Sequence, residues 1–333
     1  MTELTRRRVL AGAASATAAT VLTPLATNSP AFATAPPANK QAPGFYRYKV
    51  GDFEISVVTD GVVTLPLPDK FVQNEPKAEV QKALTAAYQP TGTVTLPFTP
   101  IVINTGPKLV LIDTGYGPEM HVKTKGTVGQ LPSNLAAAGI DPKSIDTVII
   151  SHMHLDHVSG LRTAEGDLAF PNAEVLVPAL DWAYWMSDAE MNKLPEGYTK
   201  SVYPGIRKVF AGLENKVTKY EWGKEIVPGV TTIATPGHTP GHTSYVIASG
   251  SDTVYVQSDV THVPFLFVRH PDWHAFYDQD ADMAEVTRRK VYDMLVADKM
   301  RVQGFHYPFP SLAHVEKYGT GYRELPVVWN PTI

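Results

Sequence analysis

An α/β fold, in which two β-sheets pack face to face and helices cover the outside, is the architecture that the sequence predicts. Strand-like runs recur in both halves of the chain, and helical patterns lie between and after them. No change in composition divides the chain, so a single domain from residue 45 to residue 333 is expected. With 333 residues, such a chain can bury roughly three quarters of its surface on folding.

The first half of this domain contains two hairpin patterns. Residues 46–50 and 53–58 alternate or run apolar on either side of Gly51-Asp52. Residues 101–103 and 109–112 flank a similar turn. Other expected elements are a strand at 62–67, helices at 77–88 and 134–138, and a buried strand at 147–150.

The second half alternates strands and helices. Strands are expected at 174–177, 231–234, 243–247, 253–257 and 301–305, and a helix is expected through Trp182 and Trp185. The clearest helix covers residues 281–300. Its apolar stripe is predicted to consist of Met283, Val286, Met294 and Leu295.

The N-terminus has the features of an export signal. An arginine pair at Arg6-Arg7 precedes an apolar run at 9–22 that is too short to span a bilayer, so no stable membrane insertion is expected. Ala31-Phe32-Ala33 offers a cleavage site. The segment resembles a twin-arginine signal over residues 1–33, followed by a linker at 34–44, which predicts a periplasmic or secreted protein. The alternative is a disordered basic N-terminus in a cytosolic protein.

Composition narrows the function. The net charge is -4 with mixed signs, and no basic stripe suggests a nucleic-acid surface. The chain has no cysteine. Any bound metal must therefore have nitrogen and oxygen ligands.

The stretch Ser-His-Met-His-Leu-Asp-His at 151–157 follows the buried strand at 147–150. In an extended chain alternate side chains share a face, so His152 and His154 point the same way. Asp156 and His157 need a turn to join them. The alternative, a loop of separately bonded polar residues, does not explain four metal-capable groups in six positions.

Three later sites, the first with two histidines, add to this cluster. His238 and His242 lie in a loop rich in glycine and proline after the strand at 231–234. Asp259 and His306 also follow predicted strands. In α/β folds, functional groups gather at the carboxyl ends of strands.

The order of these residues resembles the metallo-β-lactamase superfamily, and the fit is closest to the methyl parathion hydrolase and lactonase branch. Asp113-Thr114-Gly115 matches the early aspartate of that superfamily. The resemblance implies a four-layer αβ/βα sandwich with metals at one edge, between the two sheets. A homodimer is implied by the same resemblance.

Seven ligands exceed what one ion needs, so two divalent ions about 3.5–4 Å apart with a hydroxide between them are expected. By resemblance, one ion is held by His152, His154 and His238. The other is held by Asp156, His157 and His306, and Asp259 bridges both. Zinc is expected, although the donors also suit iron, manganese or cobalt. His242 and Asp113 are expected to support the ligands rather than bind metal.

Two divalent ions make hydroxide available near neutral pH, which predicts hydrolysis of an ester, with Asp156 orienting the hydroxide. Lactonases of this branch place a tyrosine three residues after the bridging aspartate; here that position is His262, which could donate a proton instead. Lactones or aryl esters are the expected substrates, with phosphotriesters as a side activity. The alternatives are a phosphotriesterase of the methyl parathion type and an exported metal-binding protein with an idle site.

Aromatic side chains are expected to line the substrate pocket, although each taken singly is also a candidate for the core. The residues are Phe71, Phe98, Trp182, Trp185, Phe265 and Trp273.

Overall fold

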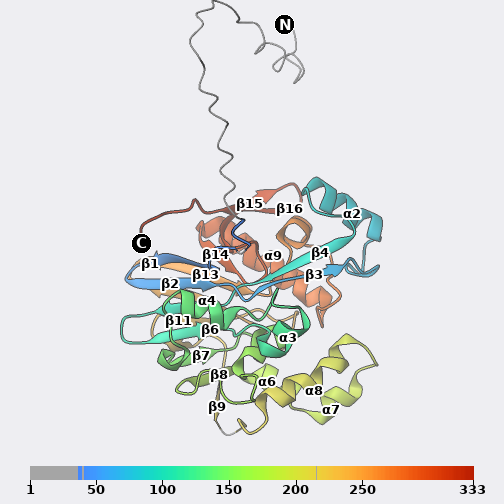
Figure 1. Ribbon diagram of the computed structural model, residues 1–333. Coiled ribbons are helices and arrows are strands. Elements are labelled where there is room, and N and C mark those ends of the chain that lie inside the picture. Colours follow the sequence, from blue (N-terminus) through green and yellow to red (C-terminus); the bar gives the residue numbers. More distant parts are fainter. Residues whose placement is uncertain (1–36, 40, 215) are drawn as a thin grey trace, which may run out of the picture. The chain divides into compact units, whose positions relative to one another are not determined.

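The computed structural model describes residues 37–39, 41–214 and 216–333 (Figure 1). The export signal predicted at 1–33 lies outside these residues and stays a prediction. Among the helices of the described residues, none is both long enough and apolar enough to cross a membrane.

All strands of the first seven-stranded sheet precede those of the second in the chain. Its strands, in spatial order, are β1 (Phe45–Val50), β2 (Phe53–Val58), β5 (Ile101–Asn104), β6 (Leu109–Ile112), β7 (Thr147–Ile149), β8 (Glu174–Pro178) and β9 (Val217–Tyr220). Both predicted hairpins are present, since β1 pairs with β2 and β5 with β6 in antiparallel register.

The second seven-stranded sheet follows the chain order. It consists of β10 (Glu225–Val227), β11 (Val230–Ala234), β12 (Thr243–Ser249), β13 (Asp252–Ser258), β14 (Arg301–Gly304), β15 (Leu312–Tyr318) and β16 (Gly321–Pro326). In the first sheet β6, β7, β8 and β9 are parallel, and in the second β13 and β14 are parallel. In each sheet, the carboxyl ends of these parallel strands therefore lie at the same edge.

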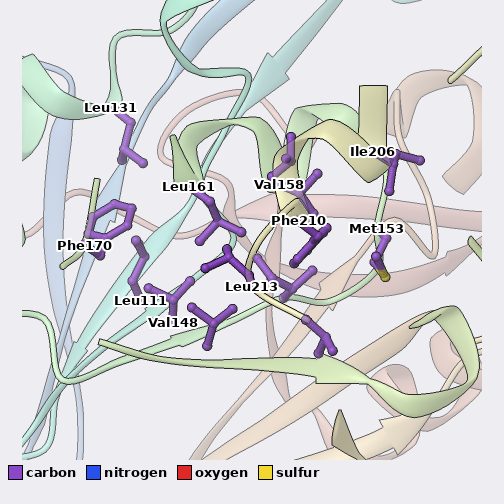
Figure 2. Close-up of a cluster of buried hydrophobic side chains, with 14 of the residues drawn as sticks. Leu111, Leu131, Val148, Met153, Val158, Leu161, Phe170, Ile206, Phe210 and Leu213 are labelled. Carbon is purple, nitrogen blue, oxygen red and sulfur yellow. The ribbon is translucent and has the colours of Figure 1, made fainter. Parts of the chain in front are cut away.

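Strand β6 shows how the layers form. Val110 and Ile112 pack in the apolar core between the two sheets, whereas Leu111 points to the other face of its sheet. Because both faces of the sheet are covered, the strand is apolar throughout. On that outer face Leu111 meets a cluster built by α4 (Leu131–Ala137), α5 (Leu155–Val158), α6 (Ala179–Trp185) and α8 (Tyr198–Phe210) (Figure 2).

Helix α9 (Ala281–Asp298) covers the outer face of the second sheet, where Val291, Tyr292 and Leu295 pack against strand residues. The order of layers is thus helices, sheet, sheet, helix, which confirms the predicted αβ/βα sandwich. The Asp280 side chain caps α9 by accepting a hydrogen bond from the N–H of Met283.

The predicted apolar stripe of α9 was wrong in its first half. Met283 and Val286 are 42% and 62% exposed, and the buried face carries Arg288 and Tyr292 instead. A hydropathy pattern does not count an arginine as a core residue. The buried guanidinium is tolerated because several oxygen acceptors surround it, as described below.

A further apolar cluster lies beside the two large sheets. It combines β3 (Gly61–Pro66) and β4 (Thr93–Phe98), which form a hairpin, with α2 (Lys77–Ala86) and the π-helical turn at Pro264–Val268. The sequence predicted β3 and α2 but neither β4 nor the turn. The other α-helices not predicted are α3 (Gly117–Lys123), α5, where only a turn was expected, α7 (Asp188–Lys193) and α8.

Candidate metal centre

The chain positions the first motif by anchoring the residues between its histidines. Met153 is fully buried in the helix-side core, so His152 and His154 face the opposite way. The Met153 N–H donates to the Asp181 carboxylate at 2.8 Å, and the same carboxylate accepts the N–H of Gly241 in the loop of His238. Asp181 therefore ties the two histidine loops together.

Three histidine nitrogens meet in the first ligand group. His152 Nε2 lies 3.1 Å from His154 Nδ1, which lies 2.9 Å from His238 Nε2. The His238 Nδ1 faces a carboxylate, so its Nε2 presents a lone pair to the other rings. Apposed lone pairs repel unless a cation lies between them. A tetrahedral zinc ion holds its nitrogen ligands about 3.3 Å apart, close to the spacing seen.

Two carboxylates and two histidines form the second group, which consists of Asp156, His157, Asp259 and His306. The Nε2 of His306 is 3.1 Å from Asp259 Oδ2 and 3.4 Å from Asp156 Oδ2. Within the described residues, His157 Nε2 and Asp259 Oδ1 are buried without a hydrogen-bond partner. Unsatisfied buried polar atoms are rare, and a bound cation would satisfy both.

Asp259 lies between the two groups. Its Oδ2 is 3.3 Å from His238 Nε2 on one side and 3.3 Å from His157 Nε2 on the other. The structure thus brings together all seven residues that the sequence singled out as ligands. Their donor types and spacing fit two divalent ions, with Asp259 placed to bridge them.

The two histidines of the second group are held from behind by hydrogen bonds to their far ring nitrogens. His157 Nδ1 lies 2.9 Å from Asp113 Oδ2, and His306 Nδ1 lies 2.8 Å from the Pro97 carbonyl. Such bonds fix the ring and aim the other nitrogen at the metal. The sequence anticipated the support by Asp113 from its motif.

His242 is a supporting residue, as expected. Its Nε2 accepts the N–H of Asp259 at 3.0 Å, and its Nδ1 lies 3.0 Å from the Thr235 carbonyl oxygen. Burial lowers the pKa of His242 to about 3, which keeps the ring neutral. A neutral ring can accept the backbone N–H and so hold the Asp259 backbone in place.

The sequence profile of the metallo-beta-lactamase superfamily matches residues 99–296, more than half of the chain. The chain belongs to this superfamily. It is a metal-dependent hydrolase with two divalent ions, and zinc is the expected metal.

Several relatives of this chain are named as lactonases. An N-acyl homoserine lactonase of a Bacillus species is 24% identical over 234 residues, 65% of this chain and 84% of the relative. The N-acyl homoserine lactonase AttM of Azorhizobium caulinodans is 30% identical over 141 residues, 40% of this chain and 45% of the relative.

Two solved structures have a similar fold. AidC, a dizinc quorum-quenching lactonase in complex with a product, is 26% identical with a TM-score of 0.80, covering 86% of this chain and 98% of AidC. The hydrolase AbOPH is 29% identical with a TM-score of 0.79, covering 87% of this chain and all of AbOPH.

His262 lies at the centre of this superfamily site. Its Nε2 is 3.0 Å from Asp259 Oδ2, and its ring stacks on His306 with centroids 4.7 Å apart. Burial lowers the pKa of His262 to about 4, although the charge of Asp259 opposes the shift. The ring is therefore neutral at pH 7 and must accept a proton before it can donate one, which refines the role expected from the sequence.

A cleft of about 380 Å³ lies beside the loop of His238. Its walls include Pro236, Tyr184 and Met283. None of the six aromatic residues expected in the lining is among its walls; except for the half-buried Phe265, they are buried in apolar clusters. Two of those six still touch ligand rings, since Phe98 packs on His306 and Trp185 on His154.

The two ligand groups are expected to differ in how their metal affinity depends on pH. Burial lowers the pKa of His306, but the charges of Asp259 and Asp156 outweigh it and raise the pKa to about 9. The pKa of His157 is also raised, whereas burial holds the pKa of His152 well below its usual value.

At pH 7.5 the metal-free second group therefore carries protons that a metal must displace. Its affinity should rise by about tenfold or more per pH unit up to pH 9, while that of the first group changes less. Calorimetric titration in buffers of different ionisation enthalpy measures the protons released. Equal release at both binding steps would contradict this assignment.

Proposed function

We propose that this enzyme hydrolyses lactones, and that N-acyl homoserine lactones are the class to test first. The names of the curated relatives and of AidC support this class. The observation that carries the proposal is the position of His262, with Nε2 3.0 Å from the Oδ2 of the central Asp259. The cleft of about 380 Å³ falls within the usual size of small-ligand pockets and offers room for an acyl group.

When bound, two divalent ions lower the pKa of water and polarise the carbonyl of the substrate. His262 Nε2 is the ring nitrogen that faces Asp259, so it is the atom placed for proton transfer beside the metal centre. His262 then takes a proton from the attacking water and returns it to the leaving oxygen. Asp156, whose side chain is 13% exposed, is the most open of the acidic ligands and orients the incoming water.

The leaving group explains why this arrangement favours lactones. Opening a lactone ring expels an alkoxide, a strong base that needs a proton as it leaves. Aryl esters and aryl phosphotriesters expel a phenolate, whose conjugate acid has a pKa of about 10, as in tyrosine. A proton relay at His262 therefore accelerates the first reaction more than the other two.

Replacing His262 tests this proposal. In His262→Ala we expect kcat on a lactone to fall by about 10²- to 10⁴-fold, the usual contribution of a proton-transfer residue. Hydrolysis of an aryl ester and an aryl phosphotriester should fall much less, and both ions should remain bound. Side-by-side rates on the three substrates, together with metal analysis, measure this.

The matched control is His262→Tyr, which places the lactonase tyrosine at this position and should recover part of the lactone rate. Equal losses on all three substrates would count against the relay. A wild-type phosphotriester rate that exceeds the lactone rate by orders of magnitude would favour the phosphotriesterase alternative. A metal-loaded protein inert on every ester would support the idle-site alternative.

We also propose that the protein is exported, on the strength of the arginine pair, apolar run and cleavage site at its N-terminus. N-terminal sequencing of protein recovered outside the cytoplasm should begin at residue 34. An uncleaved cytosolic product would rule this out.

A further inference from the structure

A second carboxylate–histidine pair supports the metal centre from a segment that carries no sequence motif. Asp278 Oδ1 lies 2.9 Å from His238 Nδ1, in the same relation that Asp113 has to His157. Each ligand group thus has one histidine that is held by a buried carboxylate. Asp278 serves the first group and Asp113 the second.

The two carboxylates differ in their other partners. Asp113 accepts the N–H and the hydroxyl of Ser151, both at 2.8 Å and both neutral donors. Asp278 instead pairs with the guanidinium of Arg288 at 3.2 Å, and both side chains are 2% exposed. Since isolated buried charges are costly, each of these two groups requires the other.

Arg288 also binds the backbone of two separate segments. Its Nε donates to the carbonyl of Val260, the residue after Asp259, at 3.3 Å. Its Nη1 donates to the carbonyls of Pro271 and Trp273, both at 2.9 Å. One side chain on α9 therefore fixes the segment that carries Asp278 and the loop that carries the bridging carboxylate.

We propose that Asp278 and Arg288 are positioning residues for the metal centre: Asp278 sets the orientation of His238 for the first ion, and Arg288 holds both Asp278 and the loop of Asp259. Neither residue is placed to touch substrate. Asp278 acts through the His238 ring and so affects one ion. Arg288 acts through Asp278 and through Val260, so it affects both ions. This inference depends on the two-metal centre and not on the choice of substrate.

The isosteric variant Asp278→Asn tests the first half, with Asp113→Asn as its matched control. Stepwise Zn²⁺ binding is measured by competition with a chromophoric chelator. We expect each variant to weaken one binding step by about 10- to 100-fold, the usual effect of losing such a partner, and to leave the other step within about threefold. The two variants should weaken different steps.

Arg288→Met tests the second half and should weaken both steps, with a larger effect on the step that Asp278→Asn weakens. Arg288→Lys keeps the positive charge but not the planar guanidinium. It should therefore preserve the ion pair with Asp278 better than the hydrogen bonds to the backbone carbonyls. A general loss of structure would lower the Zn²⁺ affinity of both binding steps equally in every variant. Circular dichroism of the metal-free proteins detects such a loss.

The proposal is overturned if Asp278→Asn leaves both steps within threefold of wild type, or if Asp278→Asn and Asp113→Asn weaken the same step. If Arg288→Met does not fold, the comparison between the two asparagine variants and the Arg288→Lys titration still decides the matter.

Discussion

Replacing Asp259 with alanine should remove at least one of the two ions and lower kcat by more than about 10³-fold. The Asp259 Oδ2 lies within 3.0–3.7 Å of nitrogens from five histidines, four from the two ligand groups and the fifth His262. Without this carboxylate, the cations would face a cluster of neutral rings, with Asp156 as the remaining acidic ligand. Metal analysis and steady-state kinetics on the same preparation measure both effects.

A matched control lies on the same strand. Asp252 begins β13, at whose end Asp259 follows, and its half-exposed side chain pairs with Arg301. Asp252→Ala should keep two ions and nearly full activity, because exposed ion pairs contribute about 0–1 kcal/mol. If Asp259→Ala retained both ions and wild-type turnover, Asp259 would not be the bridging ligand.

Replacing Asp60 with alanine should destabilise the fold by at least about 3 kcal/mol without touching the metal ligands. Asp60 is fully buried, and its carboxylate accepts three backbone N–H groups, those of Tyr116, Gly129 and Leu131, at 2.8–3.2 Å. Alanine would leave these donors buried without partners, at about 1–3 kcal/mol each. Denaturant unfolding of the metal-loaded proteins measures the loss.

The backbone at Gly115 also packs closely against the Asp60 carboxyl group. A Cβ on Gly115, which has a φ of +72°, would lie 2.4 Å from the Asp60 carboxyl carbon, so only glycine fits there. Asp141 provides the control, since it accepts one backbone N–H at the surface, that of Lys143. Asp141→Ala should cost about 1 kcal/mol or less. Equal losses in the two variants would show that the buried donors find other partners.

The sequence revealed the ligands because they sit in short motifs at strand ends. His152, His154 and His157 are neighbours in the chain, and Asp113 follows a strand in a recognisable triplet. Fold class was predictable for a similar reason, since alternation and apolar runs such as that of β6 report burial on one or both faces.

The supporting residues were not predictable in this way. Asp278 lies 40 positions from His238, and Asp181 lies 60 positions from Gly241. Their partners depend on how distant segments of the chain pack together, and such contacts leave no pattern in the local sequence. Arg288 was hidden for a further reason: a charged residue on a helix is expected to face solvent until its acceptors are known.

The two ions join two parts of the chain that no covalent cross-link connects. His152 to His157 follow a strand of the first sheet, whereas His238, Asp259 and His306 follow strands of the second. In a chain without cysteine, this linkage takes the place of a disulfide. If the linkage persisted in the unfolded chain, closing the loop between His154 and His238, which are 84 positions apart, would restrict that chain by about 4.5 kcal/mol in the loop-entropy treatment of cross-links. After a single cut in the backbone between the sheets, the two fragments should therefore bind each other more tightly with the metal present than after a chelator removes it.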